Sequence, residues 1–254
     1  MPEAVVPKPA LVLMLHGHGG TGDGMRRYKD FAIASGDGAV VVYPDGVNHG
    51  WNDGRDDRNT ADDIGFLHAL IAKVQSQYHT DAKRVYVAGM SNGAMMGLRV
   101  ACQMNEVTAV AAVAGGMPVR WKSDCRPAHP VSVLAIEGTA DPLVPFNGGG
   151  VYGGKHGFVL SAGATIGMFR TIDRCGARFP MGTPTPVAPD GTMADFQIWN
   201  ACATGSAVVL ATVQGGGHGW PGGGQNFPMR LVGIVSQSFD ASTYIWEFFK
   251  GHAL

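Results

Sequence analysis

Six short runs of apolar residues constrain the fold of this chain more than any other feature of its sequence. Each run is continuous rather than alternating, which is typical of strands buried on both faces of a sheet. The runs are residues 10–15 (ALVLML), 39–43 (AVVVY), 84–88 (RVYVA), 108–114 (TAVAAVA), 131–136 (VSVLAI) and 207–213 (AVVLATV). Helical patterns fall between them, so the sequence predicts an α/β fold with a mostly parallel central sheet and helices on both faces.

The clearest helical pattern covers residues 60–74, where Thr60 is expected to cap the first turn. Its apolar stripe comprises Ile64, Leu67, Ile71 and Val74. Further helices are expected directly after Ser91, over 161–171, and over 240–250 with Asp240 as N-cap. In such folds the chemistry gathers in loops at the carboxyl ends of the strands.

Length and charge narrow the class of protein. A chain of 254 residues fits one domain over 1–254, with the proline-dense residues 180–189 as an excursion within it. The net charge of −1 offers no basic surface for nucleic acid. Every apolar run is far shorter than the ~20 residues that a membrane helix needs, so no membrane partner is expected.

The sequence GMSNG, residues 89–93, matches the pattern G-x-S-x-G around Ser91. Because the chain holds 38 glycines, chance alone supplies about 0.2 such matches in 254 residues. The context is more specific, since the motif follows an apolar strand and opens an apolar helix, as a nucleophile elbow does. Ser91 is therefore the candidate nucleophile. The alternative is a serine that only caps the helix.

A serine nucleophile needs a histidine base and an acid that orients the histidine. His218 lies in a glycine-rich loop just after the last apolar run, and Asp141 follows the run at 131–136. The order serine, acid, histidine is one known for such triads. Glu137 is a rival acid at the strand end. The alternatives are an exposed loop histidine at 218 and a turn aspartate before Pro142.

The loop after the first strand, LMLHGHGG, can supply backbone N–H groups to a developing oxyanion. We expect the two donors to be the N–H groups of His18 and Asn92. No set of cysteine, histidine or carboxylate ligands accompanies His16 and His18, so no metal is expected. The glycine loops also lack phosphate-binding patterns, and no cofactor is expected.

Taken together, these motifs resemble the polyhydroxybutyrate depolymerase and feruloyl esterase group of secreted α/β-hydrolases, over nearly the whole chain. The matching pieces are LMLHGHGG, VVYPDG, WNDGR, ADDIGFLHALI, VYVAGMSNGAMM, LAIEGTADPLVPFNGG, GGGHGWPGG and ASTYIWEFF. The resemblance implies the α/β-hydrolase fold, with Ser91 as nucleophile, Asp141 as acid and His218 as base. Members usually carry one or two strands before the LHG strand, whereas nine residues precede Ala10 here. We expect reduced N-terminal strands and a sheet edge that is uncovered or covered by a second copy of the chain.

Four cysteines allow three disulfide connectivities, and four free thiols in a cytosolic enzyme are the alternative. The resemblance implies the pairs Cys102–Cys125 and Cys175–Cys202. Bridged cysteines would indicate a secreted or periplasmic protein. No signal-peptide pattern precedes residue 10, so the export signal is expected to lie outside this chain.

These observations predict a serine carboxylic-ester hydrolase acting on feruloyl, short polyhydroxyalkanoate or acetyl esters. No arginine or lysine stands beside the triad in the sequence, which argues against strongly anionic substrates. Trp51 and Trp220 are the candidate substrate-binding residues, with ordinary packing as the alternative reading. Two other functions stay open: a serine peptidase on the same fold, and an inactive binding protein on a hydrolase fold.

Overall fold

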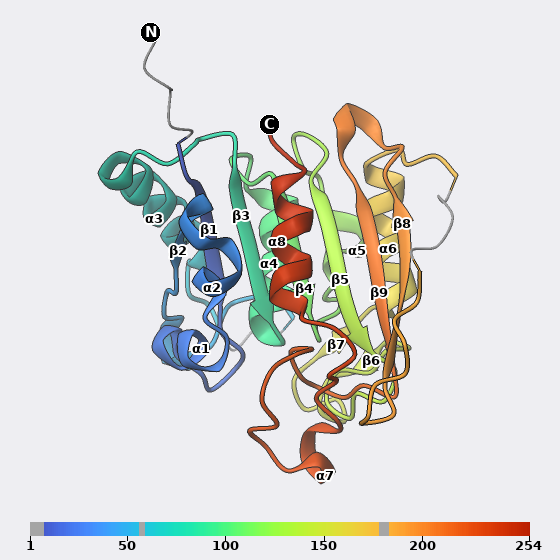
Figure 1. Ribbon diagram of the computed structural model, residues 1–254. Helices are drawn as coiled ribbons and strands as arrows, with labels where there is room; N and C mark the ends of the chain where they lie inside the picture. Colours follow the sequence, from blue (N-terminus) through green and yellow to red (C-terminus); the bar gives the residue numbers. More distant parts are fainter. Residues whose placement is uncertain (1–7, 56–58, 178–182) are drawn as a thin grey trace, which may run out of the picture.

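The computed structural model describes residues 8–55, 59–177 and 183–254, and its centre is a seven-stranded sheet of order β2-β1-β3-β4-β5-β9-β8 (Figure 1). Its strands are β1 (Ala10–Leu15), β2 (Ala39–Val42), β3 (Val85–Met90), β4 (Ala109–Val113), β5 (Ser132–Gly138), β8 (Met193–Trp199) and β9 (Val208–Gln214). Six of them are the six predicted apolar runs, and all five pairings among these six are parallel. A separate two-stranded ribbon joins β6 (Gly149–Gly150) and β7 (Phe158–Val159).

Strand β8 is the large element that the sequence analysis missed. It pairs antiparallel with β9 at one edge of the sheet. Its sequence, MADFQIW, alternates between buried and partly exposed positions over most of its length. Such alternation is typical of an antiparallel strand with one face toward solvent, and it gave no continuous apolar run to find.

Two layers of helices cover the sheet. The helices are α1 (Gly22–Tyr28), α2 (Phe31–Ser35), α3 (Asp63–Tyr78), α4 (Asn92–Gln103), α5 (Trp121–Asp124), α6 (Ala162–Ile172), α7 (Met229–Val232) and α8 (Ala241–Lys250). Leu11 and Leu13 of β1 pack on the face covered by α3, α4 and α6. Val12 and Met14 pack on the opposite face, with α1, α2 and α8. Figure 1 shows α8 in red lying across the near face of the sheet.

Local capping chemistry sets where the helices begin. Ser161 and Asp240 cap α6 and α8 through hydrogen bonds from the backbone N–H groups of Ala164 and Thr243. The predicted cap Thr60 is wrong, because α3 begins three residues later and the carboxylate of Asp62 accepts its first-turn N–H bond. An aspartate caps as well as a threonine and adds a charge that favours the helix N-terminus.

Both disulfide pairs implied by the resemblance are present. Cys102 at the end of α4 bonds to Cys125 just after α5, with Cα atoms 4.7 Å apart. Cys175 after α6 bonds to Cys202 after β8, with Cα atoms 3.9 Å apart. None of the four cysteines is free, so the alternative of four free thiols is wrong.

Strand β2 forms the other edge of the sheet and is only half-buried. Within the described part of the chain, no strand pairs with its outer side. An uncovered edge at this position agrees with the expectation from sequence. Covering of this edge by a second copy of the chain, and the extent of one domain over 1–254, stay predictions.

Residues 180–182 of the proline-rich segment 180–189 lie outside the described residues. None of the described helices is long and apolar enough to cross a lipid bilayer.

Candidate active site

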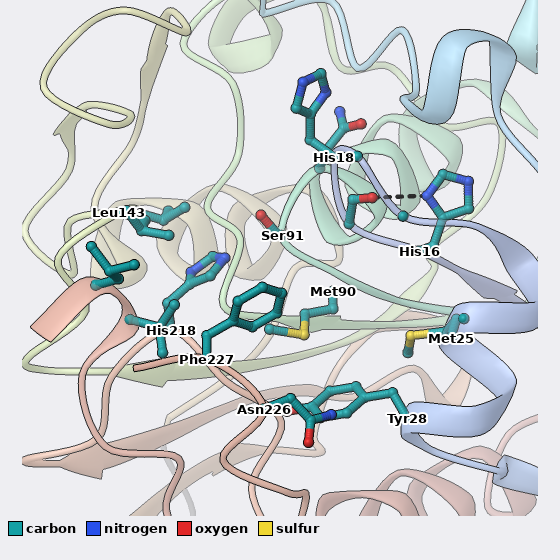
Figure 2. A pocket seen from close by; sticks show the side chains of 18 of the residues that line it. His16, His18, Met25, Tyr28, Met90, Ser91, Leu143, His218, Asn226 and Phe227 are labelled. Atoms are coloured by element: carbon teal, nitrogen blue, oxygen red, sulfur yellow. Dashed lines mark hydrogen bonds between the residues drawn. The ribbon is translucent and has the colours of Figure 1, made fainter. Parts of the chain in front are cut away.

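A cavity of about 710 Å³ lies beside the segments that follow β1, β3, β5 and β9, where the sequence predicted the chemistry. Its size is typical of a small-molecule site. Figure 2 shows Ser91, His218 and His18 projecting into this cavity. Apolar side chains supply much of the remaining wall, among them Met25, Met90, Leu143, Phe227 and Leu231.

Ser91 stands between β3 and α4 in a backbone conformation that side chains rarely adopt, with φ 56° and ψ −120°. Such strain is typical of functional turns. The turn is tight because a Cβ on Gly89 would lie 2.4 Å from the Gly93 carbonyl oxygen. The Ser91 side chain forms no capping hydrogen bond with the helix, so the reading of Ser91 as a simple N-cap is wrong. The hydroxyl is left half-buried at the cavity wall.

His218 is held by Asp141, as the sequence analysis expected. The His218 Nδ1–H donates to Asp141 Oδ2 over 2.7 Å, and both residues are more than nine-tenths buried. Asp141 Oδ1 accepts the backbone N–H groups of Leu143 and Val144 over 2.7 and 2.8 Å, which fixes the carboxylate. The readings of His218 as an exposed loop histidine and of Asp141 as a turn residue alone are both wrong.

The glycine-rich loop that carries His218 is closely packed. The N–H of His218 donates to the carbonyl of Val232, and that of Gly217 donates to Ile234. A Cβ on Gly217 would lie 2.2 Å from the Val232 carbonyl oxygen, so only glycine allows this approach. The imidazole is therefore placed by backbone contacts with residues 232–234. Ser91 and His218 line one cavity, and no hydrogen bond joins their side chains among the described residues. Catalytic hydrogen bonds are often longer without substrate.

Glu137, the rival acid, does not contact His218. Its side chain is 4% exposed, and its Oε1 accepts the N–H of Gly115 over 3.2 Å. Burial, and then the charge of Asp141, raise the pKa of Glu137 to about 8. A Cβ on Gly115 would lie 2.7 Å from the Ser91 carbonyl oxygen. Glu137 therefore holds Gly115, which packs beneath the Ser91 turn, and its carboxyl is neutral at pH values below about 8.

Replacing Glu137 by glutamine is expected to remove a pH dependence of stability. The carboxyl titrates near 4.5 when unfolded and near 8 when folded, so between these values only the folded state keeps the proton. The free energy of unfolding of the wild type therefore falls as pH rises through this window, by on the order of a few kcal/mol. Urea unfolding at pH 5 and pH 8 measures the fall. It should be smaller in Glu137→Gln and unchanged in the exposed control Glu247→Gln; equal falls in all three proteins would contradict the expectation.

The loop after β1 is pinned against the serine turn. His16 Nδ1–H donates to the Gly17 carbonyl over 2.8 Å, and His16 Nε2 accepts the Gly46 N–H over 3.0 Å. Burial lowers the pKa of His16, so this imidazole is a neutral structural group. A Cβ on Gly17 would lie 3.4 Å from Ser91 Cβ, which puts His18 beside the nucleophile candidate. The N–H of Asn92 belongs to the first residue of α4, where no intrahelical acceptor exists.

The side chain of Asn92 belongs to a buried polar network that sequence reasoning missed. Its Oδ1 accepts the Trp51 N–H over 2.7 Å, and its Nδ2 donates to Asp53 Oδ2 over 2.7 Å. Asp53 pairs in turn with Arg55, whose Nη2 lies 3.1 Å from Asp53 Oδ2. Arg55 lines the cavity, so an arginine shares the cavity with Ser91 although none stands beside the candidate residues in the sequence. The sequence signal for this network is the polar segment WNDGR, in which only Trp51 was assigned a role.

The substrate-binding assignment of Trp51 and Trp220 is corrected by their burial. Trp51 is 2% exposed and Trp220 is fully buried, and neither lines the cavity. The Trp51 indole N–H donates to the His16 carbonyl, and that of Trp220 donates to Ser242 Oγ. Each ring is satisfied inside the core, where large aromatic side chains contribute most to stability. Within the described ranges, no group of three or more histidine, cysteine or acidic side chains could hold a metal ion.

Known proteins resemble this chain in sequence and in fold. Residues 1–133 match the family model described as Esterase PHB depolymerase. The protein named "Putative esterase NocK" from Nocardia uniformis subsp. tsuyamanensis is 32% identical over 259 residues, which cover 95% of this chain and 74% of that protein. Feruloyl esterase B of Piromyces equi is 31% identical over 72% of this chain, which spans 34% of that relative's length. Among solved structures, acetyl xylan esterase from Aspergillus awamori matches with a TM-score of 0.66 and 14% identity, over 98% of this chain and 92% of that one.

Proposed function

Because the chain belongs to the esterase PHB depolymerase family, and is a carboxylic ester hydrolase with the α/β-hydrolase fold, we propose that Ser91, His218 and Asp141 form its catalytic triad. One observation carries the proposal: a strained serine without a capping bond shares a cavity with a histidine bonded to a buried aspartate. Serine hydroxyls need such a base to become nucleophilic.

The reaction follows from the groups in the cavity. His218 takes the proton of Ser91 as the hydroxyl attacks the ester carbonyl, and Asp141 stabilises the imidazolium without taking the proton. The backbone N–H groups of His18 and Asn92 hold the oxyanion, each contributing about 3 kcal/mol to transition-state stabilisation. His218 then protonates the leaving alcohol. Water activated by the same imidazole releases the acid from Ser91 and restores the enzyme.

The substrates are esters of aromatic or short aliphatic acids, namely hydroxycinnamoyl, hydroxyalkanoate or acetyl esters. Two kinds of support stand behind this range. The relatives carry names of feruloyl and other esterases, and the cavity wall offers aliphatic and aromatic surface from Met25, Met90 and Phe227. The protein acts outside the cytosol, in the medium or the periplasm, because its two disulfides persist in oxidising compartments.

Labelling with a fluorophosphonate, followed by mass spectrometry of the digested protein, tests the triad. The adduct is expected on the peptide that contains Ser91, and Ser91→Ala should lose it. His218→Gln should slow the labelling because the base is gone. An adduct on another serine, or none on a folded sample, would contradict the assignment of the nucleophile.

A further inference from the structure

A buried carboxylate contacts the residue whose backbone N–H is proposed to bind the oxyanion. Asp53 is 2% exposed and pairs with Arg55, while its Oδ2 accepts from Asn92 Nδ2 over 2.7 Å. Asn92 and Arg55 line the cavity, whereas Asp53 is not among its described lining residues. The mechanism proposed above assigns this carboxylate no part. Because it does not face the cavity, any effect that it has on the reaction passes through its two neighbours.

The carboxamide of Asn92 is fixed by three hydrogen bonds. Its Oδ1 accepts the Trp51 N–H over 2.7 Å, and its Nδ2 donates to the Trp51 carbonyl over 2.9 Å and to Asp53 Oδ2. Both N–H donors of the amide are therefore used, and rotation of this buried group would leave polar atoms unpaired at a high cost. The side chain and the backbone N–H share one residue, so these bonds also restrain the direction of the N–H.

The segment of residues 49–53 also contacts the loop after β1, which carries the second proposed donor, His18. The Trp51 indole N–H donates to the His16 carbonyl over 3.0 Å. A Cβ on Gly50 would lie 3.0 Å from His18 Nδ1, so glycine allows the segment to approach closely. The 49–53 segment therefore touches both residues that are proposed to bind the oxyanion, and it restrains one relative to the other.

Arg55 makes a carboxylate acceptable at this place. An unmatched negative charge near the reaction centre would oppose the charge that develops on the ester oxygen. Arg55 Nη2 lies 3.1 Å from Asp53 Oδ2, and the Arg55 backbone N–H donates to Oδ1 over 2.8 Å. The charge of the carboxylate is thus matched while its Oδ2 still accepts from Asn92. The pair holds the Asn92 amide without placing an unmatched charge near the oxyanion.

We propose that Asp53 is a positioning residue of the oxyanion hole, which acts through the carboxamide of Asn92 to hold the Asn92 N–H in line with that of His18. The inference rests on the proposed function, because it takes these two N–H groups as the oxyanion donors. The oxyanion develops only as the ester is attacked, so Asp53 should affect kcat and leave substrate binding nearly unchanged. A misplacement of about 1 Å in a catalytic group can cost about 100-fold in rate.

Asp53→Asn is expected to lower kcat for an aryl acetate about 10–100-fold and to change KM by less than about threefold. Both carboxylate oxygens accept hydrogen bonds, but asparagine has one oxygen, so its NH₂ group faces a donor in either orientation. The matched aryl thionoacetate, with sulfur at the carbonyl, isolates the oxyanion donors because sulfur accepts hydrogen bonds weakly. The ratio of kcat/KM for acetate over thionoacetate should fall about threefold or more. An unchanged ratio would overturn the proposal.

Asp173→Asn is the matched control. Asp173 is fully buried at the end of α6 and is not among the described residues that line the cavity. The chemical change is the same, so this variant shows what the loss of a buried carboxylate does away from the site. Urea unfolding records the change in stability of each variant, and the substrate ratio of Asp173→Asn should stay at its wild-type value. Equal falls of the ratio in the two variants would mean that Asp53 has a structural role alone.

Asn92→Ala shows whether Asp53 acts through the Asn92 amide. Alanine keeps the backbone N–H but loses the three side-chain bonds, so kcat should fall at least as far as in Asp53→Asn. The double variant should lose no more than about twofold beyond Asn92→Ala, because both changes break one connection. Losses that multiply would overturn the route through the amide. Should Asp53→Asn not fold, the substrate ratio of Asn92→Ala decides, and an unchanged ratio there would overturn the proposal.

Fluorophosphonate labelling separates this inference from the proposed triad. If Ser91 is labelled in the wild type and the substrate ratio is unchanged in Asp53→Asn, the triad stands and the positioning role fails. If Ser91 is not labelled in the folded wild type, the triad itself fails, and the inference falls with it.

Discussion

Replacement of His218 by glutamine is expected to lower kcat for ester hydrolysis by about 10⁴–10⁶-fold. The imidazole is bonded to Asp141 and shares the cavity with Ser91. Glutamine fills similar space and can still donate a hydrogen bond to Asp141, but it cannot take the proton of Ser91. Steady-state assays with an aryl acetate as substrate measure the loss of kcat.

The matched control for this variant is His156→Gln. His156 also lines the cavity, and its ring lies 5.8 Å from that of His18 rather than beside Asp141. Its replacement should change kcat by less than about tenfold, because the proposed mechanism transfers no proton to or from His156. Comparable losses in the two variants would mean that His218 is not the base.

Replacement of Gly93 by alanine is expected to lower kcat by about 10²–10³-fold and to destabilise the fold by about 1–3 kcal/mol. The new Cβ would lie 2.3 Å from the Leu15 carbonyl oxygen and 2.6 Å from that of His16. Both are backbone atoms, so the turn at Ser91 must move away from the loop that follows β1. That movement separates the two proposed oxyanion donors, His18 and Asn92. Activity assays and urea unfolding measure the two effects.

Gly167→Ala is the control for this substitution. Gly167 lies within α6, and a Cβ there meets no atom within 4 Å. Alanine is favoured over glycine in a helix interior, so this variant should gain about 0.5–1 kcal/mol of stability and keep full activity. If Gly93→Ala behaved like Gly167→Ala, the close approach of the turn to β1 would not matter for catalysis.

The sequence predicted the parallel part of the sheet because strands buried on both faces leave continuous apolar runs. Strand β8 was missed because one of its faces is partly exposed and its apolar residues alternate with Asp195 and Gln197. Helices α1, α2, α5 and α7 are seven residues or shorter, too short to show helical periodicity. The positions around Ser91 and His218 were predictable, since strand ends and glycine clusters mark them in the chain.

Other features of the cavity depend on tertiary contacts that no local pattern reveals. Trp51 and Trp220 stand next to site motifs in sequence, yet both indoles turn into the core. Arg55 was given no role from the sequence, yet in the fold it pairs with Asp53, packs against the loop at Gly157 and lines the cavity. A sequence motif therefore identifies a loop near the site, but tertiary packing determines which side chains of that loop face the cavity.

The anchoring of the His218 loop makes the position of the imidazole independent of the residues that form the neighbouring cavity wall. Backbone bonds join His218 to Val232 and Gly222 to Ser236, so the chain between these points leaves and returns to fixed positions. Within this excursion, Asn226, Phe227 and Leu231 line the cavity. The length and composition of residues 223–231 can therefore vary while the backbone bonds still hold His218, so the cavity wall can change without moving the proposed base.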